Sequence, residues 1–308
     1  MTWQAGVDRM AKSPKTIIEF LEIVMLENRP VGMLFVVATP IGNLDDITLR
    51  AVDVLKTVAI VAAEDTRRSG VLLAHIGARP SRLLSLHDHN EAARTEQLLS
   101  LLQQGHDVAL ISDAGTPLIC DPGFELVRRL VDQGVRIVPI PGPSALTAVL
   151  SASPLPVDRF FFEGFLPARG AARRNRLVEL ATSSVSVVFF EAARRLRDTL
   201  TELIEIVGPD RQVLLAKELT KIHERLVHGS IAALIQRFGD GEFFEHGEFV
   251  CVLAPSTLAR TVDEAEVIAL MTALCDELPP AQAARIAARV TGKPRNELYA
   301  YAVKYQRG

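Results

Sequence analysis

The sequence predicts an α/β protein of two domains: a mostly parallel doubly wound sheet, a smaller mixed α/β domain and a helical tail. The chain has 308 residues, more than one ordinary domain holds. From Met33 onward, short apolar runs alternate with amphipathic stretches, which is typical of β-α repeats. After Pro255 no strand pattern recurs, and the remaining sequence indicates helices alone.

The first domain is expected over residues 33–153. Its apolar runs are rich in leucine or β-branched residues and end in turn residues, as strands buried on both faces do. Right-handed crossovers between them would produce an open doubly wound sheet. The predicted strands are 34–38, 58–63, 83–86, 108–112 and 135–140, and the predicted helices are 47–56, 66–75, 91–104, 122–133 and 144–153.

The second domain is expected over residues 157–256, because Pro154 and Pro156 break the preceding helix. Its pattern mixes strands and helices, and the tail over 262–308 is expected to be helical. Residues 1–32 precede the first convincing strand and are expected to form an extension, disordered or helical, outside the core. The predicted strands are 160–163, 185–190, 212–217, 225–229 and 248–254, with helices at 171–182, 194–207, 230–238, 264–277, 280–290 and 294–305.

Composition excludes several classes of protein. Hydrophobic residues make up 48% and charged residues 23%, as in soluble globular proteins, and no apolar run is long enough to span a bilayer. The net charge of -3 provides no general attraction to nucleic acid, so any RNA contact needs local basic patches. Three widely spaced cysteines form neither a disulfide framework nor a Cys-x-x-Cys motif. No signal peptide is recognisable, so a cytoplasmic location is expected.

Polar turns follow four of the five predicted strands of the first domain, at the edge where open α/β sheets bind ligands. The turn at Pro40 and Gly42 lacks both the dinucleotide and the nucleoside triphosphate glycine patterns, which makes NAD or ATP a weak interpretation. Pro40 and Gly42 alone are compatible with an ordinary turn. A ligand site is favoured by two further rigid, glycine-containing loops, at 113–117 and 141–144.

These segments resemble the tetrapyrrole methylase superfamily. More closely, the chain is similar to the branch that methylates the 2′-hydroxyl of a cytidine in small-subunit (16S) ribosomal RNA, the ribosomal RNA small subunit methyltransferase I family. The resemblance runs from about residue 33 to residue 305 and leaves the first 32 residues outside it. Its motifs are 36–44, 63–67, 112–123, 139–145, 162–167, 189–191 and 217–221.

The resemblance implies a two-domain homodimer that binds S-adenosylmethionine in the cleft between the domains. In many small-molecule members an aspartate stands where this chain has Thr116, which argues against a tetrapyrrole substrate. The implied substrate is 16S rRNA within the small ribosomal subunit. Matched residue by residue, the implied cofactor-binding positions are Pro40, Gly42, Asp113, Gly115, Thr116, Pro117, Ser144 and Ala145.

Methyl transfer to a ribose hydroxyl needs no metal, but a positioned proton acceptor would help as charge develops. The hypothesis favoured here places Glu64, His87 and Glu91 at the acceptor, because they follow strands at the expected cofactor edge. Two alternatives remain open. Glu64 and Asp65 also suit the N-terminus of the next helix. The pair His87 and His89 is compatible with a metal site or a plain surface turn, although no further cysteine or histidine cluster accompanies it.

Three basic clusters could contact RNA despite the acidic total, although charge runs are often simply solvated. The best placed follows residues 165–167 beside the expected cleft and consists of Arg169, Arg173, Arg174 and Arg176. The others are Arg194, Arg195 and Arg197, and in the tail Arg285, Arg289, Lys293 and Arg295. In the tail, Thr291 and Gly292 separate two helices as in a helix-turn-helix. Such a unit either binds RNA or packs on the rest of the protein.

Two other functions compete with RNA methylation. A methylase of a small tetrapyrrole-like molecule would need an enclosed apolar cleft rather than an arginine-rich rim. A ribosome-binding factor that keeps the fold but transfers no methyl group would consume no cofactor. Aromatic residues make up only 6%, so RNA recognition is expected to rest mainly on shape, phosphates and the 2′-hydroxyl.

Overall fold

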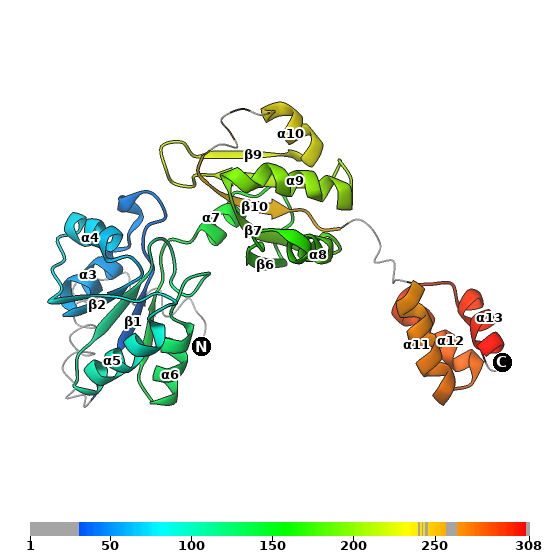
Figure 1. The fold of residues 1–308 in the computed structure, drawn as a ribbon, viewed down its shortest axis with the longest axis horizontal. Coiled ribbons are helices and arrows are strands. Elements are labelled where there is room, and N and C mark those ends of the chain that lie inside the picture. Colours follow the sequence, from blue (N-terminus) through cyan, green and yellow to red (C-terminus); the bar gives the residue numbers. More distant parts are fainter. Residues whose placement is uncertain (1–30, 240, 242, 244–245, 257–263, 306–308) are drawn as a thin grey trace, which may run out of the picture.

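The computed structural model describes residues 31–239, 241, 243, 246–256 and 264–305, which form two α/β units and a helical cluster (Figure 1). Of the predicted extension, residues 1–30 lie outside the described residues, as do 262–263 and 306–308 of the predicted tail. The described chain begins against the first unit, because the N–H of Gly32 donates to the carbonyl of Leu102 at 2.7 Å.

The first unit contains the predicted parallel sheet. Its strands lie in the order β3-β2-β4-β1-β5, and every neighbouring pair is parallel. The doubly wound prediction is confirmed, because helices cover both faces of the sheet (Figure 1). The strands are β1 (Leu34–Val37), β2 (Ile60–Ala63), β3 (Arg82–Ser85), β4 (Val108–Ile111) and β5 (Ile137–Ile140).

Successive residues of each strand point to opposite faces, which divides the apolar core in two. Helices α3 (Leu49–Thr57) and α4 (Thr66–His75) pack on one face, and α5 (Glu91–Gln103) and α6 (Phe124–Asp132) pack on the other. The turns after β1, β2 and β4 therefore emerge together at the carboxyl edge, as predicted.

The second unit contains a mixed sheet in the order β6-β7-β10-β8-β9. Only β6 and β7 are parallel, and the remaining pairs are antiparallel. Helices α8 (Gly170–Ala181), α9 (Ala193–Val207) and α10 (Ile231–Phe238) cover one face. The strands are β6 (Phe160–Phe165), β7 (Ser186–Ala192), β8 (Gln212–Lys217), β9 (Arg225–Ser230) and β10 (Glu248–Leu253).

Helix α7 (Ala145–Ser151) packs on the other face of this second sheet, where Val149 is fully buried. The sequence had placed this helix in the first domain because the prolines follow it. Its apolar residues instead meet β7, β8 and β10, so the chain passes from one unit to the other at residues 141–144. The loop after β5 thereby belongs to the junction between the two sheets.

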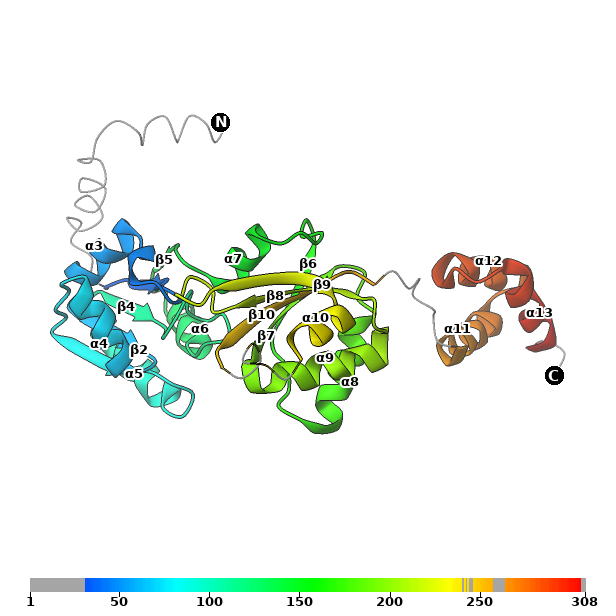
Figure 2. The same ribbon diagram turned by 90° about the horizontal axis from the view of Figure 1, so that it is seen from above.

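The tail consists of α11 (Glu264–Glu277), α12 (Pro280–Thr291) and α13 (Arg295–Tyr305), as predicted. The three helices pack on one another around small residues such as Ala284 and Ala287, and form the orange and red cluster of Figure 2. Gly292 ends α12 in the left-handed conformation, with φ of 71°. None of the helices in the described ranges is long and apolar enough to cross a membrane.

Candidate active site

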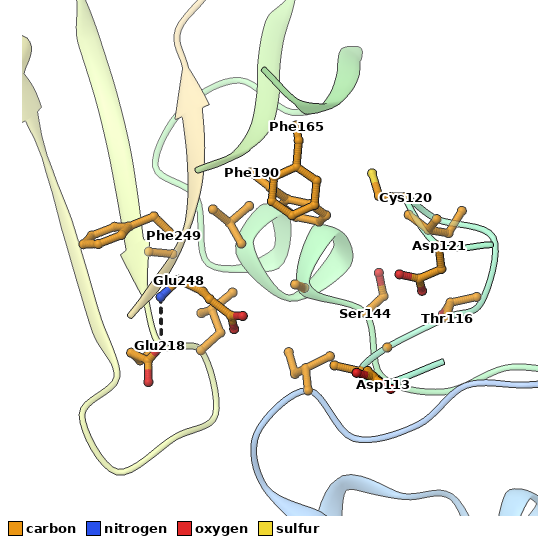
Figure 3. A pocket seen from close by; sticks show the side chains of 18 of the residues that line it. Asp113, Thr116, Cys120, Asp121, Ser144, Phe165, Phe190, Glu218, Glu248 and Phe249 are labelled. Atoms are coloured by element: carbon orange, nitrogen blue, oxygen red, sulfur yellow. Dashed lines mark hydrogen bonds between the residues drawn. The ribbon is translucent and has the colours of Figure 1, made fainter. Parts of the chain in front are cut away.

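A cavity of about 420 Å³ lies between the two α/β units and is lined by both (Figure 3). The first unit contributes the loops after β1, β2, β4 and β5. The second contributes the carboxyl ends of β6 and β7, the loop after β8 and the start of β10. Its volume is within the roughly 300–1,000 Å³ typical of small-molecule sites.

Hydrogen bonds fix the first-unit loops to one another. The N–H of Thr39 donates to the carbonyl of Gly115 at 2.9 Å, and the N–H of Gly115 donates back at 3.0 Å. Gly115 has φ of 85°, which a residue with a side chain adopts only under strain. The Thr116 hydroxyl donates to the carbonyl of Pro143 at 3.2 Å. The loops after β1, β4 and β5 thus form one rigid floor.

The positions implied for the cofactor fall in two groups. Asp113, Gly115, Thr116, Ser144 and Ala145 line the cavity. The other three, Pro40, Gly42 and Pro117, belong to the same loops but are not among its lining residues.

Gly42 instead allows the two units to approach closely. A β-carbon at this position would lie 2.4 Å from Cγ of Lys221 and 3.0 Å from the carbonyl oxygen of Leu219. Since Lys221 and Leu219 both line the cavity from the second unit, any side chain at residue 42 would press on that wall.

Three carboxylates form an acidic wall on the first-unit side of the cavity: Glu64, Asp113 and Asp121. Burial raises the pKa of Glu64, and the negative charge of Asp113 adds to the effect. Burial also raises the pKa of Asp121 to about 6, with Glu64 and Asp113 contributing. The Oδ2 atom of Asp121 is buried and has no hydrogen-bond partner among the described residues.

Asp121 was not selected from the sequence, although it lies within the 112–123 motif. The signal that could have indicated it is the Asp-Pro-Gly turn directly before α6, which follows the Gly-Thr-Pro loop. An acidic residue in such a turn is equally compatible with helix capping, and only the fold places it at the cavity.

The neighbours Glu64 and Asp65 have different roles. The Asp65 side chain caps α4 by accepting the N–H of Arg67 at 2.9 Å, which is the capping alternative considered for this pair. Glu64 lines the cavity.

His87 and Glu91 do not line the cavity. The Nε2 atom of His87 lies 3.1 Å from Nδ2 of Asn90, while its Nδ1 atom is buried without a described partner. The Oε1 atom of Glu91 accepts three backbone N–H groups, from Gly123 at 3.1 Å, Glu125 at 3.0 Å and Leu126 at 3.3 Å. Glu91 therefore holds the N-terminus of α6, and with it the end of the Asp121 loop.

The second-unit wall combines aromatic rings with an ion network. Phe165 and Phe190 lie together at one side of the cavity, and Glu218, Glu248 and Phe249 lie at another (Figure 3). Nζ of Lys221 lies 3.1 Å from carboxylate oxygens of both Glu218 and Glu248.

Backbone strain is concentrated beside the cavity. Within the described ranges, the non-glycine residues with positive φ are Leu118, Cys120, Glu218 and Thr220. They occupy two loops, one from each unit, and Cys120 and Glu218 line the cavity directly. Such conformations persist only where the surrounding structure enforces them, and they are frequent at functional sites.

The basic cluster on α8 is divided between surface and interior. Arg169 and Arg174 are exposed, and Arg174 pairs with Glu205 at 3.0 Å. The Arg176 guanidinium is bound by Glu163 and Glu179.

Arg173 was predicted to contact RNA, but its side chain is only 5% exposed and lies inside the second unit. Its guanidinium lies 3.3 Å from the fully buried carboxylate of Glu191 and also contacts the Thr199 hydroxyl. Position 173 faces the interior because it lies one helical turn before the buried Leu177.

Two family models match the chain. The model described as tetrapyrrole (corrin/porphyrin) methylases matches residues 33–235, which include both α/β units up to α10. The model described as the RsmI C-terminal HTH domain matches residues 261–306, the helical tail.

Curated relatives and solved structures agree with these models. A ribosomal RNA small subunit methyltransferase I from Xylella fastidiosa is 47% identical over 272 residues, covering 87% of this chain and 98% of that protein. The protein of the same name from Escherichia coli O157:H7 is 44% identical over 275 residues, covering 89% and 96%.

Among solved structures, the cobalamin biosynthetic enzyme cobalt precorrin-4 methyltransferase is similar in fold. Its TM-score is 0.55 at 18% identity, and the match covers 72% of this chain and 94% of that one. A uroporphyrin-III C-methyltransferase from Thermus thermophilus, complexed with S-adenyl homocysteine, has a TM-score of 0.51 at 17% identity, covering 72% and 97%. This chain belongs to the tetrapyrrole methylase family and, within it, to the ribosomal RNA small subunit methyltransferase I family.

Proposed function

We propose that this chain is an S-adenosylmethionine-dependent methyltransferase that 2′-O-methylates the ribose of a cytidine in 16S rRNA of the small ribosomal subunit. The observation that supports this most strongly is the cavity between the two units, with an acidic wall on one side and aromatic rings on the other, in a chain whose relatives are named as methyltransferases of small-subunit rRNA. The proposal includes a homodimer acting in the cytoplasm, as the family resemblance implies.

The residues at the cavity fit S-adenosylmethionine. Gly115, with φ of 85°, lets the backbone of the loop after β4 line the cavity directly, without a side chain of its own. The carboxylates of Glu64, Asp113 and Asp121 complement a positively charged sulfonium group. The orphaned Oδ2 atom of Asp121 marks a polar group without a described protein partner. When bound, this cofactor supplies an electrophilic methyl carbon.

The chain's own residues would hold the acceptor hydroxyl and receive its proton. Glu64 and Asp121 are the candidates at the cavity, and their raised pKa values bring them closer to working pH as proton acceptors. Glu91 would act through position, because it anchors α6 immediately after the Asp121 loop. His87 would act through the same turn, where its backbone N–H donates to Oδ1 of Asn90 at 2.9 Å directly before Glu91. Closure of the cavity between two units would exclude water from the transfer.

RNA contact would use the exposed arginines of the 169–176 cluster rather than the whole cluster. Arg169 and Arg174 are at the surface of α8, whereas the buried Arg173 supports the fold. Phosphate contacts made by arginines release counterions, so affinity for RNA should fall steeply as salt rises.

One experiment separates the proposed function from its competitors. Purified protein is incubated with methyl-labelled S-adenosylmethionine and, in parallel, small subunits lacking the modification, naked 16S rRNA, or a uroporphyrinogen. Transfer to RNA supports the proposal, and transfer to the tetrapyrrole would support a small-molecule methylase instead. Cofactor and subunit binding without transfer to any acceptor would indicate a noncatalytic ribosome-binding factor.

A further inference from the structure

Phe165 is an exposed aromatic residue in the wall of the cavity. It stands at the carboxyl end of β6 and is 58% exposed, although it lines the space between the two units. Its ring meets Phe190 edge-on with centroids 5.3 Å apart, and Phe190 meets Phe162 in the same way at 5.2 Å. The ring is therefore supported from behind while much of its surface stays open to solvent.

The opposite side of the cavity comes close to this strand end. A β-carbon on Gly164 would lie 2.8 Å from Sγ of Cys120, so the loop that carries Cys120 and Asp121 rests against the residue before Phe165. Figure 3 shows Phe165 and Phe190 on one side with Cys120 and Asp121 beside them. A planar group lying on the Phe165 ring would have its attached groups near the acidic wall.

A nucleobase is the planar group that fits this arrangement. The 2′-hydroxyls of helical RNA lie along its wide minor groove, but a cavity between two units encloses a reacting hydroxyl only when the nucleotide that carries it turns out of its stack, as in enzymes that act on bases. Proteins compensate for lost stacking by placing an aromatic ring under the displaced base. Phe165 combines a largely exposed ring with a place in the cavity wall, at the proposed acceptor end of the site.

We propose that Phe165 is the stacking platform for the base of the target nucleotide, which is displaced from the RNA so that its ribose faces Asp121 and Glu64. This inference rests on the proposed function and names the residue that positions the acceptor. Phe190 holds the ring in place, and the open side of Phe165 receives the base.

The strand provides its own control. Phe160, at the other end of β6, is also exposed, at 43%, but does not line the cavity. Replacing Phe160 by alanine removes a similar exposed ring from the same strand without touching the proposed acceptor subsite.

The test compares Phe165→Ala, Phe165→Leu, Phe165→Trp and Phe160→Ala in methyl transfer to small subunits at saturating cofactor. If the base stacks on Phe165, Phe165→Ala and Phe165→Leu should lower kcat/KM roughly tenfold to a hundredfold, mainly by raising KM. Phe165→Trp, which keeps an aromatic ring, should have a kcat/KM within about threefold of that of the unchanged protein. Affinity for S-adenosylmethionine should change less than about twofold. Phe160→Ala should behave as the unchanged protein.

Two results would overturn the inference: full activity of Phe165→Leu, since apolar bulk would then suffice, or a loss of cofactor affinity that matches the loss of activity.

A second readout does not depend on catalysis. The sequence contains one tryptophan, Trp3, so Phe165→Trp adds a second fluorescent residue at the cavity. Stacking of the base on this residue should quench its fluorescence when small subunits bind. Quenching absent in Phe165→Trp, or equal in Phe160→Trp, would contradict stacking. Failure of the proposed function is distinct, because the unchanged protein would then label no RNA.

Discussion

Asp113 and Asp65 connect the carboxyl ends of two neighbouring strands, β4 and β2: Oδ1 of Asp113 accepts the backbone N–H of Asp65 at 2.9 Å. The other carboxylate oxygen of Asp113 pairs with Arg68 at 3.2 Å. The same side chain lines the cavity, so one carboxylate both fixes the turn after β2 and contributes negative charge to the site.

Asp113→Asn should therefore weaken cofactor binding more than it weakens the fold. The amide keeps the size of the side chain but removes its charge, so we expect about a tenfold loss of affinity for S-adenosylmethionine and roughly 1 kcal/mol loss of stability. Calorimetric titration and urea unfolding measure the two effects. Asp132→Asn, at an exposed position on α6, is the control and should change neither. Unaltered cofactor affinity in Asp113→Asn would remove Asp113 from the site.

Gly42→Ala should disturb the contact between the two units. The added methyl would lie 2.4 Å from the Lys221 side chain, which can move, and 3.0 Å from the Leu219 carbonyl, which cannot move without its backbone. We expect a destabilisation of about 1–2 kcal/mol and lower cofactor affinity.

Gly70→Ala is the matched control for Gly42→Ala. Nothing lies within 4 Å of the β-carbon it would add, and the residue is inside α4, where alanine favours the helix by about 0.5–1 kcal/mol. Equal unfolding and binding curves for the two variants would show that the approach at Gly42 has no consequence.

Asp121→Asn should stabilise the fold at neutral pH while it lowers activity. The pKa of Asp121 is raised from 3.8 to about 6, so the folded protein holds this proton more tightly than the unfolded chain. Stability then falls as pH rises from about 4 to 6, and above that range the ionised carboxylate destabilises the fold fully. After allowance for solvent screening, the variant should gain about 1 kcal/mol at pH 7.5 and nothing near pH 4.

The pH dependence of methyl transfer tests the role of Asp121 separately. If its carboxylate accepts the proton, kcat/KM of the unchanged protein should fall below about pH 6, and Asp121→Asn should lose that limb along with most of its rate. A variant that keeps both its rate and its acid limb would assign proton acceptance to another group, with Glu64→Gln as the next variant to measure.

Arg173→Ala and Arg174→Ala should separate support of the fold from RNA contact. Removing Arg173 takes one of two guanidinium partners from the buried Glu191 carboxylate, which keeps Arg195 at 2.6 Å, so the loss should cost about 1–3 kcal/mol of unfolding free energy. Arg174 is exposed, so its loss should change stability by less than about 0.5 kcal/mol. In filter-binding assays Arg174→Ala should nonetheless weaken RNA binding and reduce its salt dependence. Unchanged RNA affinity would remove Arg174 from the RNA surface.

The sequence predicted the fold well because alternating apolar runs and amphipathic stretches report directly on strands and helices. It did not predict which unit α7 packs on, because the apolar residues of a helix between two sheets could pack on either sheet. It also did not separate Arg173 from Arg174, because a run of arginines reveals its buried member only once the orientation of α8 is fixed.

The site was predicted in part for a similar reason. Loops at the ends of neighbouring parallel strands converge by geometry, so Glu64 and Asp113 could be placed from the sequence. Phe165 belongs to the second unit and reaches the cavity only because the two units meet, which no local pattern encodes. Asp121 lies in the same loop as Asp113, but directly before α6, where helix capping is an equally good interpretation of an acidic residue. Glu91 follows a strand as Glu64 does, yet its side chain turns to the amides of α6.

Alkaline hydrolysis of the labelled RNA shows directly whether the methyl group has been transferred to a ribose hydroxyl. Small subunits lacking the modification are methylated with labelled cofactor, and their 16S rRNA is hydrolysed completely. We expect the label in a single alkali-resistant dinucleotide beginning with cytidine, because a 2′-O-methyl group blocks cleavage there. Label recovered only in mononucleotides would place the methyl group on a base and rule out ribose methylation.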